Sequence, residues 1–175
     1  LVRFIKDADA VIAGTETFSD EILSQCTELK VISKYGVGLD NIDFDSCTKN
    51  GIAVYSKPGV NKLSVAEMTL GFMLSLCRNL YKSSILLKQG DWVKNGGQQL
   101  SGKTIGIIGV GHIGKEVIRL LKPFGCRILV NDIVDQSKYY EENNLVFLEK
   151  DQLISESDLI TIHTDLNEKT RKLMD

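Results

Sequence analysis

Three glycines at a fixed spacing form the most chemically informative stretch of the chain. Gly109, Gly111 and Gly114 stand in GVGHIG, between the apolar run TIGII and a segment whose apolar residues recur at helical spacing. The first amides of a helix lack partners within the helix, and the helix dipole favours an anion there. Gly109 permits a tight turn, Gly111 lets the backbone approach a phosphate, and Gly114 lets the helix pack near the strand. The pattern predicts a pyrophosphate-binding loop; the alternative is a tight turn without a ligand.

An acidic residue ends the next apolar run, CRILVND. Asp132 can accept hydrogen bonds from both ribose hydroxyls of an adenosine. The same carboxylate would repel a 2′-phosphate, so the sequence favours NAD over NADP. A strand, a glycine turn, a helix and a second strand that ends in an acid are together more specific than the glycines alone.

The elements that must position these residues follow an alternating plan. Short β-rich runs at residues 9–14, 29–33 and 52–56 alternate with expected helices near residues 19–26 and after Asp43, which is expected to cap its helix. This alternation predicts βαβ units and parallel sheets, and hence an α/β fold. We place a substrate-binding lobe at residues 1–80 and a partial dinucleotide-binding domain at residues 81–175.

The segment SVAEMTLGFMLSLCRNL is expected to be a long helix. Ser64 and Glu67 form the S-x-x-E pattern of a capping box, and apolar residues cover nearly every face through Leu80. A helix that is apolar on all sides is buried, so we expect it between the domains or against another subunit.

The composition excludes several classes of partner. The net charge is -2, and Lys and Arg are scattered among Asp and Glu, so no basic patch indicates binding to nucleic acid or to an anionic membrane. No apolar run is long enough for a membrane span and no signal-peptide pattern opens the chain, so we expect a cytoplasmic protein. The four cysteines form no CxxC and are expected to be reduced, and neither histidine has metal-ligand spacing, so no metal site is expected.

Several ordered motifs point to one family. KYGVGLDNID, the long apolar helix and LSGKTIGIIGVGHIGKEV resemble the D-isomer-specific 2-hydroxyacid dehydrogenases, and most of all the branch of D-3-phosphoglycerate dehydrogenase with the hydroxypyruvate and glyoxylate reductases. The resemblance runs from about Asp7 to Asp175. It implies a flavodoxin-like substrate lobe and a Rossmann-like NAD lobe, both incomplete in this chain, with the long helix in a homodimer interface. It also implies hydride transfer between NAD(H) and a small 2-hydroxy or 2-keto acid, and for the phosphoglycerate branch a role in serine biosynthesis.

The same resemblance assigns residues to the cofactor. They are the three loop glycines with Val110, His112, Ile113, Asp132, Thr164 and Lys57. Lys57 would reach toward the nicotinamide side, and the alternative is an ordinary exposed lysine. Asp165 stands where relatives usually have proline, which could loosen the loop beside the cofactor. His163 follows an apolar strand and is expected to be packed or hydrogen-bonded rather than a general base.

The substrate residues implied by the resemblance lie in KYGVG. The backbone amides of Val37 and Gly38 would hold the substrate carboxylate, because a glycine-rich turn after a strand can aim successive N–H groups at an anion. The alternative is an Asx turn made by Asp40 and Asn41. Lys34 falls where phosphoglycerate enzymes place a basic residue near the substrate phosphate; the alternative is a solvated surface lysine.

No catalytic residue is assigned within the chain. By the resemblance, the family's catalytic Arg, Glu and His lie beyond Asp175, and we expect a chain truncated at both ends: a piece of a longer enzyme, or an inactive truncated product. The main alternative is a non-catalytic NAD(H)-binding module that acts through protein contacts. A different Rossmann enzyme would leave KYGVGLDNID unexplained.

Overall fold

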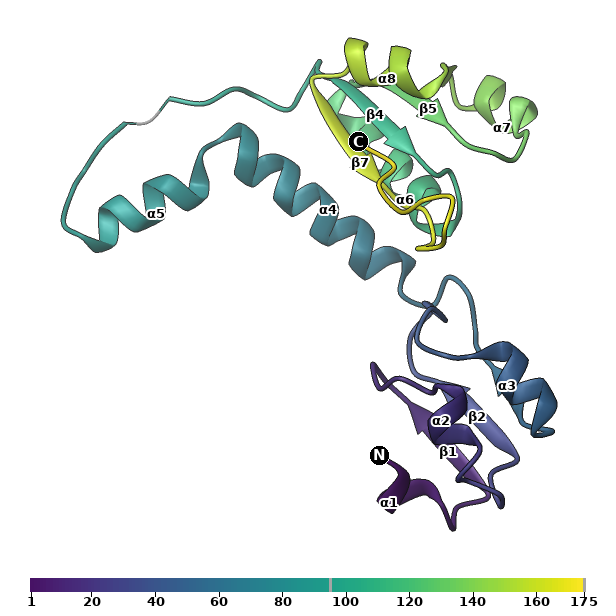
Figure 1. The fold of residues 1–175 in the computed structure, drawn as a ribbon. Helices are drawn as coiled ribbons and strands as arrows, with labels where there is room; N and C mark the ends of the chain where they lie inside the picture. Colours follow the sequence, from purple (N-terminus) through teal and green to yellow (C-terminus); the bar gives the residue numbers. More distant parts are fainter. Residues whose placement is uncertain (95, 175) are drawn as a thin grey trace. The chain divides into compact units, whose positions relative to one another are not determined.

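The computed structural model describes residues 1–94 and 96–174, and the chain divides into two compact units. The first unit comprises Leu1–Asn61 and Asp165–Asp175, and the second comprises Lys62–Thr164. Each unit holds one parallel sheet with helices, which confirms the α/β fold with two lobes (Figure 1).

The first unit contains a three-stranded parallel sheet in the order β1-β2-β3. Its strands are β1 (Ala10–Ala13), β2 (Val31–Lys34) and β3 (Ala53–Tyr55), and its helices are α1 (Val2–Ile5), α2 (Asp20–Leu23) and α3 (Phe44–Lys49). Strands that are consecutive in the chain are therefore neighbours in the sheet. The last three strands of the flavodoxin-like order, 2-1-3-4-5, have the same arrangement. Ile32 on the central strand and Phe18 before α2 are fully buried in its core.

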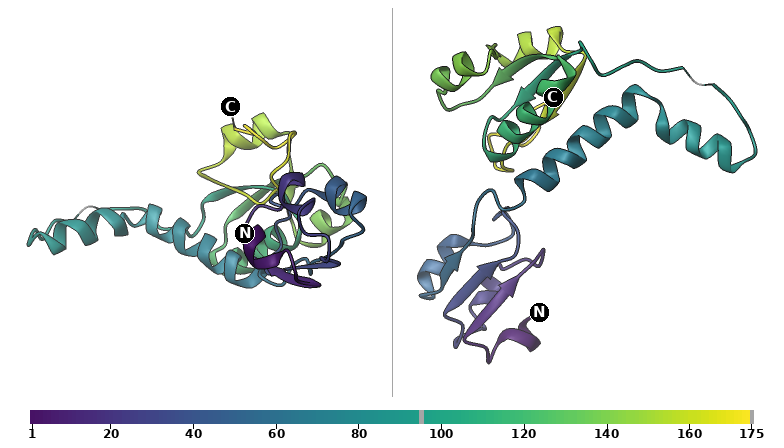
Figure 2. Two further views of the ribbon diagram at one scale, coloured as in Figure 1. Left: turned by 60° about the horizontal axis from the view of Figure 1, so that its bottom comes forward. Right: turned by 180° about the vertical axis from the view of Figure 1, so that it is seen from behind.

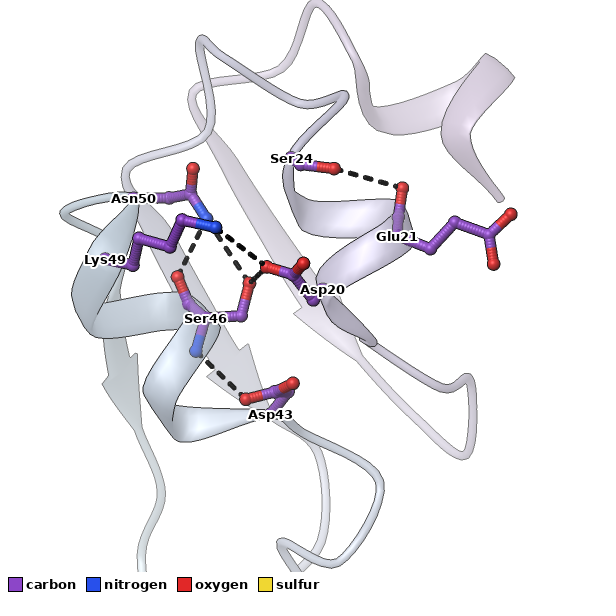
Figure 3. A network of polar contacts seen from close by, with 7 residues as sticks. All are labelled: Asp20, Glu21, Ser24, Asp43, Ser46, Lys49 and Asn50. Atoms are coloured by element: carbon purple, nitrogen blue, oxygen red, sulfur yellow. Dashed lines mark hydrogen bonds and ion pairs between the residues drawn. The ribbon is translucent and has the colours of Figure 1, made fainter.

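A polar network joins α2 to α3 on this unit (Figure 3). The Asp43 carboxylate accepts the Ser46 amide at 2.9 Å, which confirms the expected cap of α3. The buried Ser46 hydroxyl donates to Asp20 Oδ1 at 2.8 Å, and Lys49 Nζ lies 3.6 Å from the same oxygen. Because the buried hydroxyl has this partner, the two short helices can pack without leaving a polar group unsatisfied.

The second unit contains a four-stranded parallel sheet in the order β6-β5-β4-β7. The strands are β4 (Thr104–Ile108), β5 (Arg127–Asn131), β6 (Val146–Phe147) and β7 (Leu159–Ile162). Numbered within the unit, this is the order 3-2-1-4 that opens the doubly wound nucleotide-binding fold. The chain reverses direction across the sheet between β4 and β7, where that fold places its ligand crevice.

Helices cover both faces of this sheet, which Figures 1 and 2 show from opposite sides. On one face α6 (His112–Leu121) packs over Ile105 and Ile107, and α4 packs on α6. On the other face α8 (Lys150–Glu156) lies so close that a Cβ on Gly106 would collide with Leu153. The 3-10 turn η1 (Lys122–Phe124) and α7 (Ser137–Glu142) complete the unit. The central strand is therefore buried on both sides, as its apolar sequence predicted.

The long helix α4 (Lys62–Cys77) starts earlier than predicted. It begins two residues before Ser64, so Ser64 lies in the first turn and the predicted capping box is misplaced. The second compact unit begins at Lys62, and Ala66 and Met73 of this helix belong to its core. The domain boundary after Leu80 stays a prediction. The assignment of this helix to a substrate lobe and to an interface between subunits stays a prediction.

A left-handed residue, Asn79 with φ 52°, separates α4 from α5 (Leu80–Lys88). α5 contains no buried residue, whereas its Leu80, Tyr81 and Leu87 are exposed. Three further exposed apolar side chains, Met68, Phe72 and Leu76, are spaced four residues apart along α4. Because that spacing places them on one face of a helix, the α4–α5 region presents an apolar surface.

The four cysteines, Cys26, Cys47, Cys77 and Cys126, are all free. Burial raises the pKa of the Cys26, Cys47 and Cys126 thiols, which favours inert reduced side chains. None of the helices within residues 1–94 and 96–174 is both long enough and apolar enough to cross a membrane.

Candidate functional site

The glycine loop GVGHIG connects the end of β4 to the start of α6. Gly109 has φ 92°, and a Cβ there would lie 2.5 Å from the His163 carbonyl oxygen at the end of β7. A Cβ on Gly114 would collide with the Gly109 carbonyl oxygen. Contacts within the protein thus require both glycines: one for a left-handed turn under β7, the other for the close approach of α6 to its own loop.

The middle glycine has no such explanation. Gly111 has an extended backbone, with φ -77° and ψ -153°, and a Cβ on it would meet nothing within 4 Å. It is the N-cap residue of α6, and no side chain caps the helix. Among the described residues, none accepts a hydrogen bond from the amides of His112 and Ile113 at the start of α6. Free amides at a helix N-terminus, beside a glycine without a side chain, are the arrangement that an anion needs.

Asp132 follows β5 directly and contacts the glycine loop. Its Oδ2 accepts the Val110 amide at 2.6 Å, and its Oδ1 accepts the Val134 amide at 2.9 Å. The structure thus brings together the loop and the acid that the sequence predicted to share a ligand. The Val110 amide, however, is bonded to Asp132, which leaves His112 and Ile113 as the better placed donors to a pyrophosphate.

Thr164 lies beside the same loop. Its Cγ2 would be 3.1 Å from a Cβ on Gly109, so the chain leaving β7 passes next to the turn. The preceding His163 is half-buried, and its Nε2 lies 2.9 Å from Thr161 Oγ1. Burial lowers the pKa of His163, which favours the neutral ring. His163 is therefore a hydrogen-bonded residue at a strand end, as expected.

The loop after β2 holds the predicted substrate residues in the first unit. No residue in the described part of the chain accepts a hydrogen bond from the amides of Val37 or Gly38. Both residues line a pocket of about 280 Å³ with Leu39, Asp40, Asp165 and Leu166. Free amides at the carboxyl end of a parallel strand can bind a carboxylate, as the sequence suggested.

Lys34 and Asn41 tie this loop to the loop after β1. Lys34 Nζ donates to Asn41 Oδ1 at 2.7 Å and to the Gly14 carbonyl oxygen at 2.5 Å. Asn41 Nδ2 donates to the Glu16 carbonyl oxygen at 2.6 Å. Lys34 is thus half-buried and hydrogen-bonded rather than a solvated surface lysine, and the Asn41 side chain bonds across to another loop instead of forming an Asx turn.

Lys57 lies after β3, is exposed, and forms no hydrogen bond or ion pair with the residues that the structure describes. Its expected place beside the nicotinamide stays a prediction. Within the same described part, no three His, Cys, Asp or Glu side chains are grouped so as to hold a metal ion.

A larger pocket, of about 660 Å³, lies at the amino ends of β4 and β7. Lys103 and Asp158 line it with their charged atoms 3.6 Å apart, and Asp158 also accepts the Thr104 amide at 2.9 Å. Ligands of open parallel sheets bind at the carboxyl ends of the strands. The glycine loop, at the carboxyl end of β4, is therefore a better candidate for a ligand site than this larger pocket.

One residue of the loop region was missed from the sequence. Gln136 Nε2 lies 3.2 Å from the Val110 carbonyl oxygen and 3.4 Å from Asp132 Oδ2. The contact with Asp132 spans only four residues, but the one with Val110 joins residues that are far apart in the chain, so the local sequence did not indicate that Gln136 reaches the glycine loop.

Comparison with known proteins agrees with this geometry. Residues 70–175 match the family model described as D-isomer specific 2-hydroxyacid dehydrogenase, NAD binding domain. The chain is 37% identical over 179 residues to D-3-phosphoglycerate dehydrogenase of Methanocaldococcus jannaschii, which covers 99% of this chain and 34% of that protein. It is 35% identical over 177 residues to hydroxypyruvate reductase of Thermotoga maritima, covering 99% and 57% of the two chains.

A solved structure extends the comparison to the fold. D-lactate dehydrogenase from Aquifex aeolicus, complexed with NAD and lactic acid, matches with a TM-score of 0.86 and 30% identity, over 97% of this chain and 52% of that one. The chain therefore spans between about a third and somewhat more than half of the length of these relatives.

Proposed function

Because the chain belongs to the D-isomer-specific 2-hydroxyacid dehydrogenase family, we propose that the protein is an NAD-dependent oxidoreductase of small 2-hydroxy and 2-keto acids. Residues 70–175 correspond to the family's NAD-binding domain. The observation that carries the proposal is the open space over Gly111, a glycine that neither its backbone conformation nor its packing requires. When bound, NAD supplies the hydride acceptor, and the residues described here bind and orient it.

The cofactor residues divide by the part of NAD that they would hold. The amides of His112 and Ile113, with Gly109, Gly111 and Gly114 shaping the loop, bind the pyrophosphate. Asp132 binds the adenosine ribose, Val110 holds Asp132 in place, Thr164 lies beside the cofactor, and Lys57 would reach toward the nicotinamide side. The negative charge of Asp132 supports NAD over NADP, because a 2′-phosphate beside that carboxylate would be repelled.

The substrate carboxylate binds the amides of Val37 and Gly38. Lys34 holds the loop that contains these two amides, because two of the three N–H groups of its ammonium donate to the Gly14 carbonyl oxygen and to Asn41 Oδ1. The remaining N–H is available to an anionic group of the substrate. Recognition of a phosphorylated substrate would depend on this one remaining N–H group of Lys34. The proposed role in serine biosynthesis depends on the same contact.

The experiment on Lys34 compares two substrates in the full-length protein. If the third N–H contacts a phosphate, Lys34→Met raises the Michaelis constant for 3-phosphohydroxypyruvate by a larger factor than that for hydroxypyruvate, which changes only through the loop. If Lys34 only positions the loop, both constants rise together. An unchanged constant for the phosphorylated substrate would exclude the phosphate contact.

The test of the proposed function is NADH binding followed by turnover. We expect NADH to bind more tightly than NADPH, and the full-length protein to oxidise NADH when hydroxypyruvate, glyoxylate or 3-phosphohydroxypyruvate is added. Binding without turnover on any of these acids would instead support a non-catalytic NAD(H)-binding module. No NADH binding at all would refute both.

The apolar surface of α4 and α5 supports assembly as a homodimer. Each large apolar side chain that a second copy covers contributes about 1.5–3 kcal/mol. Phe72→Glu would place a charge in that interface and is expected to give a monomer in sedimentation experiments. Phe4→Glu, at an exposed aromatic residue of α1, is the matched control and should leave the assembly unchanged.

A further inference from the structure

One glutamine links the two loops that would bind the cofactor. The Gln136 side-chain amide donates to the Val110 carbonyl oxygen at 3.2 Å and lies 3.4 Å from Asp132 Oδ2. The same Oδ2 accepts the Val110 amide at 2.6 Å. Val110, Asp132 and Gln136 are therefore each hydrogen-bonded to the other two, and these bonds join the loop after β4 to the loop after β5.

The helix that follows Gln136 does not account for its side chain. Gln136 is the N-cap residue of α7, a position where Ser, Thr, Asp and Asn are preferred, and its side chain makes no capping bond. Asp135 accepts the amide of Ser137 instead, at 2.9 Å. The Gln136 amide is therefore directed to the glycine loop, and the reason for its presence lies outside α7.

These contacts also determine how Asp132 can meet a ligand. Its Oδ2 is used by Val110 and Gln136, whereas its Oδ1 accepts only the Val134 amide among the described residues. A carboxylate oxygen has two lone pairs, so Oδ1 retains an acceptor site for a ribose hydroxyl. The carboxylate cannot turn about its bond to Cβ without breaking contacts on both of its oxygens.

We propose that Gln136 is a positioning residue for the adenosine ribose, which holds Asp132 and the glycine loop in one arrangement before the cofactor binds. The inference rests on the proposed function. A site ordered in advance binds more tightly, because less freedom is lost on binding. The fixed carboxylate also keeps its charge toward the 2′ position, so Gln136 contributes to the discrimination against NADPH.

The test is Gln136→Met, which keeps the length of the side chain and removes the donor. We expect the dissociation constant of NADH, measured by titration calorimetry, to rise about tenfold, a typical effect of losing hydrogen bonds to a charged group. NADPH should be affected less, so the ratio of the two constants falls. Gln152→Met on α8, where Nε2 bonds Glu156 at 2.9 Å, is the matched control and should change neither constant.

Two further variants separate positioning from a general loss of structure. Gln136→Glu keeps the shape but replaces the donor with a second carboxylate beside Asp132, and should weaken NADH binding more than Gln136→Met. In an Asp132→Asn background, Gln136→Met should no longer change the ratio of the NADH and NADPH constants, since the residue acts through the Asp132 charge.

The outcomes are distinct. If the unaltered protein binds NADH and Gln136→Met binds both cofactors as the unaltered protein does, the role of Gln136 is refuted while the proposed function stands. An equal rise in both constants, with a lower melting temperature, would show only structural support and also refute it. If the unaltered protein does not bind NADH, the proposed function fails first.

Discussion

Gly111→Ala distinguishes a loop that binds a phosphate from a loop that only turns. Without a ligand the added methyl group meets nothing within 4 Å, and the extended backbone at this position is accessible to alanine. As an N-cap residue, alanine is less favourable than glycine by about 0.5–1 kcal/mol. Alanine also lowers the conformational entropy of the unfolded chain, which stabilises the folded protein by about 0.4–1 kcal/mol. The free energy of unfolding should therefore change by less than about 1 kcal/mol, which is a shift in melting temperature within about 4 °C.

Binding of the cofactor should respond very differently. The methyl group would occupy the space through which a pyrophosphate reaches the first amides of α6. Loss of two charge-assisted hydrogen bonds, at about 1.5–3 kcal/mol each, corresponds to at least about a 100-fold rise in the dissociation constant of NADH. Calorimetric titration with NADH measures this rise, and thermal unfolding monitored by circular dichroism measures the stability.

Two glycine variants serve as matched controls. Gly114→Ala would collide with the Gly109 carbonyl oxygen and should destabilise the fold by about 1–3 kcal/mol. Gly71→Ala, on an exposed face inside α4, also meets nothing within 4 Å and should stabilise the helix by about 0.5–1 kcal/mol with unchanged NADH affinity. If Gly111→Ala bound NADH as tightly as Gly71→Ala, the assignment of the loop to a pyrophosphate would be wrong.

Three further predictions follow from single side chains. Tyr140→Phe should leave the free energy of unfolding unchanged or raise it by up to about 1 kcal/mol in urea titrations, because its buried hydroxyl has no partner among the described residues; a loss above about 1 kcal/mol would contradict this. Burial lowers the pKa of His163 in the folded state, so the unfolded chain binds the proton first, and the stability present above the ordinary pKa of 6.5 is lost as the pH falls. His163→Gln should therefore reduce the difference in stability between pH 8 and pH 5, and an unaltered difference would exclude this residue as its source. Asp165→Asn removes a carboxylate from the pocket of Val37 and should lower the Michaelis constant for a 2-keto acid in the full-length protein by about two- to fivefold. An unchanged constant would show that this carboxylate does not oppose binding of the substrate carboxylate.

The nucleotide-binding half could be predicted from the sequence in detail. The strand TIGII, the helix after Gly111 and the position of Asp132 were all indicated, because local periodicity, glycine chemistry and a fixed order of elements act together there. The first unit was also recognised, although α2 is shorter than expected and ends at Leu23. Its short helices depend on tertiary contacts such as that between Ser46 and Asp20, which the local sequence does not indicate.

The errors have identifiable physical causes. Ser64 and Glu67 satisfy the capping pattern, but Asn61 is also a residue preferred at N-caps, and the local sequence does not choose between the two starts of α4. The role of Lys34 in bridging Gly14 and Asn41 could not be seen either, because those residues come from separate loops at one end of the sheet.

The folding of the short helix α5 should depend on protein concentration. It has nine residues and none of them is buried, whereas isolated helices shorter than about 12–15 residues are marginal in water. In the proposed dimer the second copy would supply the missing contacts, so folding of α5 and association become one linked equilibrium. Hydrogen exchange at residues 80–88 should therefore slow as the protein is concentrated, and dilution should expose this segment to proteases before the two sheets unfold.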